Sequence, residues 1–271
     1  MSYITNSKKT YEARGAAHPH ALVRQLLTLM SEKRTNLCLS ADVTTTSSLL
    51  ALADSIGPYI AVLKTHMDIL VDFSASTIPA LQALSEKHNF LLFEDRKFVD
   101  IGNTAMLQYR GSQRIVEWAH FVNACVLAGE GTIKGLEKLA LTPEYAGRRA
   151  LLLLAEMTSE GSLATGKYTQ RAISLAHEHK EFVVGYIAHS PLIAPADGAE
   201  VDMLTFTTGI NRISAGDSLL QKYRTPKEAV AGGSDVVIVG RGLYENPDPV
   251  GEAKAYRDEA WKAYEERVGL A

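Results

Sequence analysis

The sequence predicts an α/β protein of the (β/α)8 TIM-barrel class with an extra N-terminal helix. Two observations lead to this fold: eight short apolar runs recur along the chain, and most are followed by a segment with helical spacing. Continuous apolar runs are typical of parallel strands that are buried on both faces. The length of 271 residues suits a barrel that folds as one domain. The runs cover residues 36–43, 59–66, 89–95, 120–126, 150–157, 182–188, 201–206 and 234–240.

The segments around these strands favour helices, with one exception. Residues 20–33 precede the first strand and repeat leucine and valine at helical spacing, which predicts the extra helix. Residues 77–88 show the same pattern after the second strand. After the sixth strand, residues 189–198 look like a loop. We expect residues 1–34 to form an N-terminal extension with its helix, and residues 35–271 to form a single barrel domain.

A doubly wound open sheet is the alternative fold, because periodicity does not show whether a sheet closes. Such a sheet is expected to carry a Gly-x-Gly-x-x-Gly phosphate loop after an early strand. The sequence has no such motif. The barrel is therefore the favoured interpretation.

Composition describes an ordinary globular chain and argues against several partners. Hydrophobic residues make up 46% and charged residues 22%, and 28 basic against 31 acidic residues give a net charge of −3. This balance does not favour nucleic-acid binding. No apolar run is long enough to span a bilayer, and the start of the chain lacks a signal-peptide pattern. Cys38 and Cys125 lie inside apolar runs and are expected to be reduced core thiols, as in a cytoplasmic protein.

Charged residues follow several of the predicted strands. Asp42 ends the first strand, Lys64 the second, and Asp95 with Lys97 the third, while Arg241 follows the eighth. In a barrel these strand ends meet at one mouth, where active sites lie. Any one of these charges alone is more often a solvated loop residue. Four such strand ends, each preceded by an apolar run, indicate a site.

Lysines interleaved with aspartates favour one kind of chemistry. A lysine beside a carboxylate stays protonated, so it serves better as a proton donor than as a Schiff-base nucleophile. A nearby aspartate would repel an anionic group on a substrate until that group left as a neutral molecule. This pattern suits decarboxylation followed by protonation. A magnesium site is the competing use of the carboxylates, which are Asp42, Glu94, Asp95 and Asp100.

Gly240, Arg241 and Gly242 form a second candidate motif after the eighth strand. Barrels often bind phosphate in the loops after strands seven and eight. Glycines allow close backbone approach, and arginine binds phosphate through two N–H groups. Without the fold context, a tight turn with a surface arginine is equally consistent with these residues.

Residues 91–104, "LLFEDRKFVDIGNT", carry a family resemblance. They match the signature of the orotidine 5′-phosphate decarboxylase family, and the chain resembles its eukaryotic, monofunctional members. The ten successive residues "DRKFVDIGNT" are highly specific. "TNLCLSADV", "LKTHMDIL", "GSLATGKYT", "QKYRT" and "SDVVIVGRG" match in the same order, so the resemblance covers nearly the whole chain.

The resemblance implies a reaction and its catalytic residues. Orotidine 5′-monophosphate would lose its C6 carboxylate as CO2 and give uridine 5′-monophosphate in de novo pyrimidine synthesis, without metal or organic cofactor. Lys97 would protonate C6, while Asp95 would press against the departing carboxylate. The family's charged tetrad falls on Lys64, Asp95, Lys97 and Asp100.

The resemblance also implies how substrate is held. Asp100 and Thr104 would reach into the site of a partner subunit, so the active unit is expected to be a homodimer. Asp42 and Lys64 would hold the ribose hydroxyls, and Thr158 would contact the pyrimidine. The phosphate would be bound by Gln221, Tyr223 and Arg241, with Gly240 beside it.

Four positions depart from the family pattern, and they leave two alternatives open. Thr158 replaces a serine, Thr208 a proline, Leu220 a common glycine and Cys125 a histidine. The first alternative is a catalytically impaired barrel that binds nucleotide phosphates without turnover. The second is a related magnesium-dependent sugar-phosphate decarboxylase or aldolase, which activity in EDTA would exclude.

Overall fold

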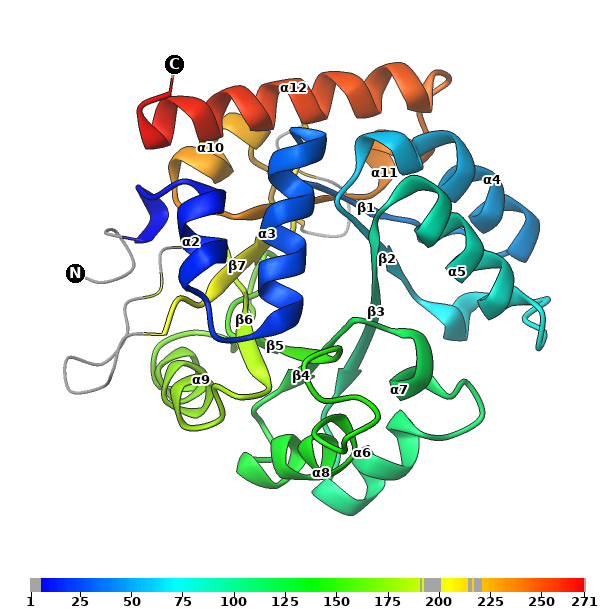
Figure 1. The fold of residues 1–271 in the computed structure, drawn as a ribbon, viewed down its shortest axis with the longest axis vertical. Coiled ribbons are helices and arrows are strands. Elements are labelled where there is room, and N and C mark those ends of the chain that lie inside the picture. Colours follow the sequence, from blue (N-terminus) through cyan, green and yellow to red (C-terminus); the bar gives the residue numbers. More distant parts are fainter. Residues whose placement is uncertain (1–5, 191, 193–200, 214–215, 217–220, 271) are drawn as a thin grey trace.

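Eight parallel strands close into a barrel in the computed structural model of this protein (Figure 1). The structure describes residues 6–190, 192, 201–213, 216 and 221–270. Each strand pairs with the next in the chain, and β8 pairs back onto β1. The predicted fold class is therefore confirmed. The strands are β1 Leu37–Ser40, β2 Val62–Thr65, β3 Leu91–Phe98, β4 Phe121–Cys125, β5 Ala150–Leu154, β6 Val183–Ile187, β7 Leu204–Thr207 and β8 Val236–Val239.

Helices follow most of the strands and form the outer layer of the barrel (Figure 1). The loop predicted over residues 189–198 lies largely outside the described residues. Among the helices of the described part of the chain, none has the length and apolar character needed to cross a bilayer. The helices around the strands are α4 Thr46–Ile56, η1 Gly57–Tyr59, η2 Met67–Ile69, α5 Thr77–His88, α6 Gly102–Tyr109, α7 Ile115–Trp118, α8 Glu130–Ala140, α9 Lys167–Glu178, α10 Pro226–Ala231, α11 Arg241–Tyr244 and α12 Pro249–Val268.

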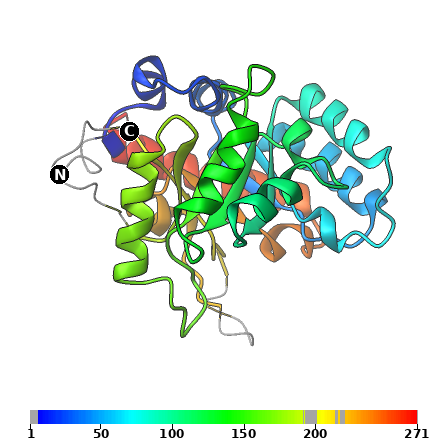
Figure 2. The ribbon, with the colours of Figure 1, turned by 90° about the horizontal axis from the view of Figure 1, so that it is seen from below.

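Among the elements whose bounds the structure gives, two helices and not only the predicted one precede β1. They are α2 (Tyr11–Ala17) and α3 (Ala21–Lys33), and Figure 2 shows them in dark blue at one end of the molecule. The sequence of α2 has few large apolar residues, so its periodicity is weak. The proline after His18 disfavours helical backbone at His18, which is extended and ends α2.

These two helices cover the amino-terminal end of the barrel. The Lys33 ammonium, in the last turn of α3, donates to carbonyls that precede β2 and β3, including Ile60 O at 2.6 Å and Asn89 O at 2.9 Å. Tyr11 Oη donates to Asp235 O at 3.0 Å, directly before β8. The opposite end of the barrel, where the strands finish, stays open for a site.

Arg14 fixes α2 to the barrel through two carboxylates. Its guanidinium bonds Asp202 through Nε at 2.7 Å and through Nη2 at 3.0 Å, and it also bonds both oxygens of Asp235. Arg14 and Asp235 are buried. Burial alone would raise the pKa of Asp235, but Arg14 outweighs it and holds the pKa below its usual value. The pair therefore stays ionised inside the protein.

Inside the barrel, aromatic rings form an apolar layer. The rings of Phe93 and Phe206 lie 6.2 Å apart between centroids, and those of Phe121 and Phe206 lie 5.6 Å apart. β7 is not a neighbour of β3 or β4 in the sheet, so these rings meet across the interior. Such a core is filled and has no pore.

The Glu94 side chain links β3 to the end of β2 through two hydrogen bonds. Thr65 Oγ1 donates to Glu94 Oε2 at 2.6 Å, and Met67 N donates to Oε1 at 3.0 Å. Burial raises the pKa of Glu94 to about 8, although these two hydrogen bonds lower it. At neutral pH the carboxyl is therefore mostly protonated.

We expect Arg14→Met to lower the free energy of unfolding by about 3–5 kcal/mol, because it leaves a buried carboxylate without its main partner. The matched control is Arg34→Met. Arg34 pairs with Glu265 at 2.6 Å but is largely exposed, so its loss should cost about 1 kcal/mol or less. Urea unfolding measures both. Equal small losses in the two variants would contradict the anchoring role of Arg14.

We also expect Glu94→Gln to change how stability depends on pH. The pKa of Glu94 rises on folding from 4.5 to about 8, so its stabilising contribution is complete below 4.5 and is lost as the pH rises through 8. Glutamine stays neutral and escapes this loss. Between pH 6 and 8 the parent should therefore lose roughly 2 kcal/mol relative to Glu94→Gln in urea unfolding. Glu86→Gln, an exposed change on α5, is the control, and parallel curves for parent and Glu94→Gln would refute the assignment.

Candidate active site

Two adjoining cavities open at the carboxyl ends of the strands. Their volumes are about 220 Å³ and about 200 Å³. Residues from β2, β3 and β8 and from the segments after β7 line both of them, so they form one continuous site. The shared lining residues are Lys64, Asp95, Thr208, Gln221 and Ile238.

The Asp95 carboxylate is the centre of this site and has donors on both oxygens. Oδ2 lies 2.8 Å from Lys64 Nζ and 3.1 Å from His66 Nε2. Oδ1 accepts from Lys97 Nζ and from Asn123 Nδ2, each at 2.7 Å. Burial alone would raise the pKa of Asp95, but Lys64, His66 and Lys97 outweigh it and hold the pKa well below its usual value. Asp95 is therefore a buried, fully ionised carboxylate.

Lys64 joins Asp95 to a second carboxylate, that of Asp42. The Lys64 ammonium lies 3.4 Å from Asp42 Oδ1, and its side chain is only 5% exposed. Burial lowers the pKa of Lys64, but Asp95 and Asp42 raise it further, so the net shift is upward. Ser40 Oγ lies 2.9 Å and 3.0 Å from the two oxygens of Asp42 and orients them. A chain of alternating charges thus runs from Asp42 through Lys64 and Asp95 to Lys97.

The far side of the site carries donors suited to an anionic group. Arg241 Nη2 donates to Tyr223 Oη at 2.6 Å, and both residues line the larger cavity. Gln221 Nε2 donates to Thr158 Oγ1. Gly209 allows the two loops to approach, because its φ is +70° and a Cβ there would lie 2.7 Å from Lys222 O.

The structure brings nearly all of the predicted site residues together. Asp100 and Thr104 are the two that do not line the cavities. The predicted residues that do line them are Asp42, Lys64, Asp95, Lys97, Thr158, Gln221, Tyr223, Gly240 and Arg241.

Asp100 and Thr104 lie instead on the segment from β3 to α6. The Asp100 carboxylate is exposed and accepts from Ile101 N at 2.7 Å, while Thr132 Oγ1 donates to the Asp100 carbonyl at 2.7 Å. Ile101 is 66% exposed and Leu107 51% exposed. This segment therefore combines a carboxylate with exposed apolar side chains.

The four positions that differ from the pattern of the resembled family have different places in the structure. Thr158 and Thr208 both line the site, with their Oγ1 atoms 3.5 Å apart. Cys125 is half-buried at the end of β4 and does not line either cavity. Leu220 lies outside the described residues.

Sequence reasoning missed two residues that contact Asp95, namely His66 and Asn123. His66 follows Lys64 by two positions at the end of β2, the spacing that puts both on one face of a strand. Asn123 is the polar residue inside the apolar run of β4. Period-two spacing and a polar residue within a buried strand were the signals that could have found them.

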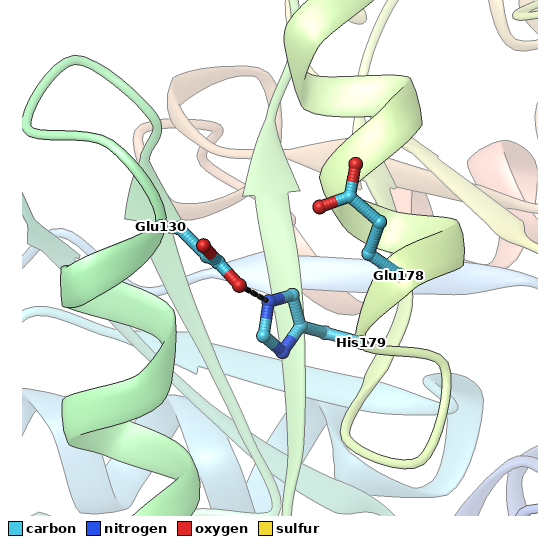
Figure 3. A group of neighbouring side chains, drawn as sticks. All are labelled: Glu130, Glu178 and His179. Carbon is cyan, nitrogen blue, oxygen red and sulfur yellow. Dashed lines mark hydrogen bonds and ion pairs between the residues drawn. The ribbon is translucent and has the colours of Figure 1, made fainter.

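The carboxylates considered for a magnesium site do not converge. Glu94 points behind β3, Asp100 is exposed, and Lys64 lies between Asp42 and Asp95. Among the described residues, the group that could hold a metal is Glu130, Glu178 and His179, in the helical layer (Figure 3).

That group lines neither cavity, and its carboxylates already have cationic partners. Glu130 pairs with Lys134 at 2.9 Å and with His179 at 3.1 Å, while Glu178 pairs with Arg171 at 2.9 Å. The group of Glu130, Glu178 and His179 is therefore separate from the site at the barrel mouth.

Sequence comparison identifies the kind of protein that shares these features. A sequence model described as "Orotidine 5'-phosphate decarboxylase / HUMPS family" matches residues 35–256. Orotidine 5'-phosphate decarboxylase of Coccidioides immitis is 53% identical over 271 residues, covering 98% of this chain and 99% of that protein. The enzyme of the same name from Aspergillus oryzae is 52% identical over 275 residues, with the same coverage.

Solved structures share the fold at lower identity. Orotidine 5'-phosphate decarboxylase from Pyrococcus horikoshii matches with a TM-score of 0.60 and 24% identity, covering 83% of this chain and 98% of that one. Orotidine 5'-monophosphate decarboxylase from Methanocaldococcus jannaschii, complexed with the inhibitor BMP, matches with a TM-score of 0.61 and 20% identity at the same coverage. These likenesses support the barrel fold.

Proposed function

Because the chain belongs to the orotidine 5'-phosphate decarboxylase / HUMPS family, we propose that it converts orotidine 5′-monophosphate to uridine 5′-monophosphate and CO2. It is then a carboxy-lyase of pyrimidine biosynthesis. The observation that carries this proposal is the alternating row of Lys64, Asp95 and Lys97 at the barrel mouth. A carboxylate fixed between two ammonium groups can act on a substrate that loses one anionic group and gains one proton.

Asp95 supplies the electrostatic stress in this proposal. It is buried, ionised and held by Lys64, Lys97 and Asn123. A substrate carboxylate placed against it is repelled, and the repulsion ends when the group leaves as neutral CO2. Such ground-state destabilisation requires binding energy from elsewhere on the substrate.

Lys97 supplies the proton. When the bond from C6 to the carboxylate carbon breaks, its electron pair stays on C6, and a proton from Lys97 Nζ forms the new C–H bond. Lys97 regains its proton from solvent, to which its side chain is 35% exposed. Transfer by a positioned ammonium is general acid catalysis.

The remaining lining residues bind the nucleotide. Asp42 and Lys64 hold the ribose hydroxyls, and Thr158 contacts the pyrimidine. The phosphate is bound at the far side of the site, where its contacts provide energy that offsets the stress at Asp95. The phosphate-binding residues are Gln221, Tyr223, Gly240 and Arg241.

The active unit in this proposal is a homodimer with shared sites. Asp100 and Thr104 do not line their own chain's cavities, and exposed Val99, Ile101 and Leu107 lie beside them. Exposed apolar side chains gathered on one segment are typical of an interface. Asp100 then completes the charged tetrad of the partner's site.

The proposal includes a cytoplasmic location and catalysis without metal. Cys38 and Cys125 are free thiols, in keeping with a reducing compartment. The interleaving of Lys64 between Asp42 and Asp95 disfavours a shared Mg²⁺ there, which counts against the magnesium-dependent alternative.

We expect the purified protein to consume orotidine 5′-monophosphate and release CO2 in excess EDTA, and Lys97→Ala to lower kcat by about 10³-fold or more. The exposed change Lys134→Ala, on α8, is the control. Uridine 5′-monophosphate binding tests whether the Lys97→Ala site stays intact. If Lys97→Ala turned over at the parent rate, Lys97 would not be the proton donor. A parent that binds the product without turnover would instead support the impaired-barrel alternative.

Mixed dimers test the shared site. Asp100→Ala and Lys97→Ala homodimers should each be nearly inactive. In a mixed dimer, one of the two sites receives an intact Lys97 from one chain and an intact Asp100 from the other, so up to half of the parent activity per verified mixed dimer should return. Separately tagged chains allow that species to be purified. Absence of recovery, with both homodimers inactive, would place Asp100 in its own chain's site.

A further inference from the structure

We propose that Asn123 is a positioning residue that fixes the Asp95 carboxylate for decarboxylation. This inference rests on the function proposed above. Asn123 lies in β4, is only 1% exposed and lines the smaller cavity. Its Nδ2 donates to Asp95 Oδ1 at 2.7 Å, the same oxygen that accepts from Lys97.

The need for such a residue comes from an irregularity in the sheet. Glu94 pairs with Val122, and the next pair joins Lys97 to Asn123, so the ladder between β3 and β4 skips two residues of β3. The skipped residues are Asp95 and Arg96. A bulge of this kind re-aims side chains but removes the regular pairing that would hold them. Asn123 restores a fixed contact from β4 to the residue that the bulge releases.

The chemical character of Asn123 is as important as its place. Lys64 and Lys97 also hold Asp95, but each cation weakens the negative field that the carboxylate presents to a substrate. A carboxamide is neutral and donates a hydrogen bond without adding charge. Asn123 therefore restrains the carboxylate while leaving its charge in place.

The amide orientation follows from its neighbour. Asp95 is ionised and accepts only, so the Asn123 atom facing it is the N–H donor and not the carbonyl oxygen. Within the described part of the chain, Asn123 Oδ1 is buried without a hydrogen-bond partner. A buried polar atom in that state costs stability, so the side chain is poorly explained as a stabilising element.

Kinetics of Asn123→Ala provide the first test, with orotidine 5′-monophosphate as substrate and uridine 5′-monophosphate as the binding probe. We expect kcat to fall by about 10²-fold, the scale for a misplaced catalytic group. KM and product binding should change by less than about threefold, because ribose and phosphate contacts are untouched. Parent kcat in Asn123→Ala would overturn the inference, as would a change in KM alone.

The matched control is Asn36→Ala. Asn36 is also a buried asparagine with an unpartnered Oδ1, but its Nδ2 donates to Ala260 O at 3.4 Å and it lines neither cavity. Its loss should alter thermal stability and leave kcat unchanged. An equal fall in kcat for both variants would make the effect structural and overturn the positioning role.

Asn123→Asp adds a readout that a structural role would not move. The introduced carboxyl can donate to Asp95 when protonated and repels it when ionised, and two close carboxyls raise the pKa of the pair. The ratio of its kcat to the parent kcat should therefore rise as the pH falls from 8 to 6. Taking this ratio at each pH cancels the pH effects that both proteins share. The other ionisable groups that face Asp95 are Lys64, His66 and Lys97.

The outcomes separate the two levels of the argument. A constant ratio across this pH range would overturn the role of Asn123 while the parent still decarboxylates its substrate. A parent without turnover would overturn the proposed function, and this inference with it. A rising ratio, together with the kcat loss of Asn123→Ala, would establish Asn123 as the residue that positions Asp95.

Discussion

A single buried charge, the carboxylate of Asp95, sets the conditions that the rest of the barrel mouth meets. A carboxylate out of water is costly unless donors surround it, and Asp95 has donors from three consecutive strands. Lys64 and His66 come from the end of β2, Lys97 from β3 and Asn123 from β4. Three strands must therefore keep their register for one charge to stay ionised. The parallel barrel supplies that register, because each of these strands is paired on both sides.

The surroundings of Asp95 are arranged so that this charge retains its strength. Beneath it, Phe93, Phe121 and Phe206 exclude water from the barrel interior, where charges interact more strongly than in solvent. Behind β3, Glu94 is mostly protonated at neutral pH and so adds little negative charge of its own. Two adjacent acidic residues thus differ in protonation: Asp95 is ionised and Glu94 is mostly protonated. The difference follows from their partners, because cations surround Asp95 whereas Glu94 accepts from a hydroxyl and a backbone amide.

Much of this arrangement could be predicted from the sequence, and the limits have physical reasons. Apolar runs and the charges at their ends sufficed for the barrel and for Lys64, Asp95 and Lys97, because strand ends in a barrel converge. Asn123 was missed because its partner depends on the bulge in β3, and a sequence does not reveal where pairing skips residues. Helix α2 was missed because its stability comes from Arg14 bonding two distant aspartates. The placement of Asp100 outside its own cavity followed from resemblance alone, since spacing within one chain does not indicate a second subunit.

The anchoring of Arg14 has a consequence for how the chain matures during synthesis. Arg14 leaves the ribosome well before its partners, because Asp202 follows it by 188 residues and Asp235 by 221 residues. Until Asp202 and Asp235 have been made, α2 therefore lacks the two carboxylates that anchor it, and β1 lacks its neighbour β8. The barrel can close only after β8 has emerged and can pair with β1. Until then its apolar strands are exposed, which makes the nascent chain a substrate for chaperones.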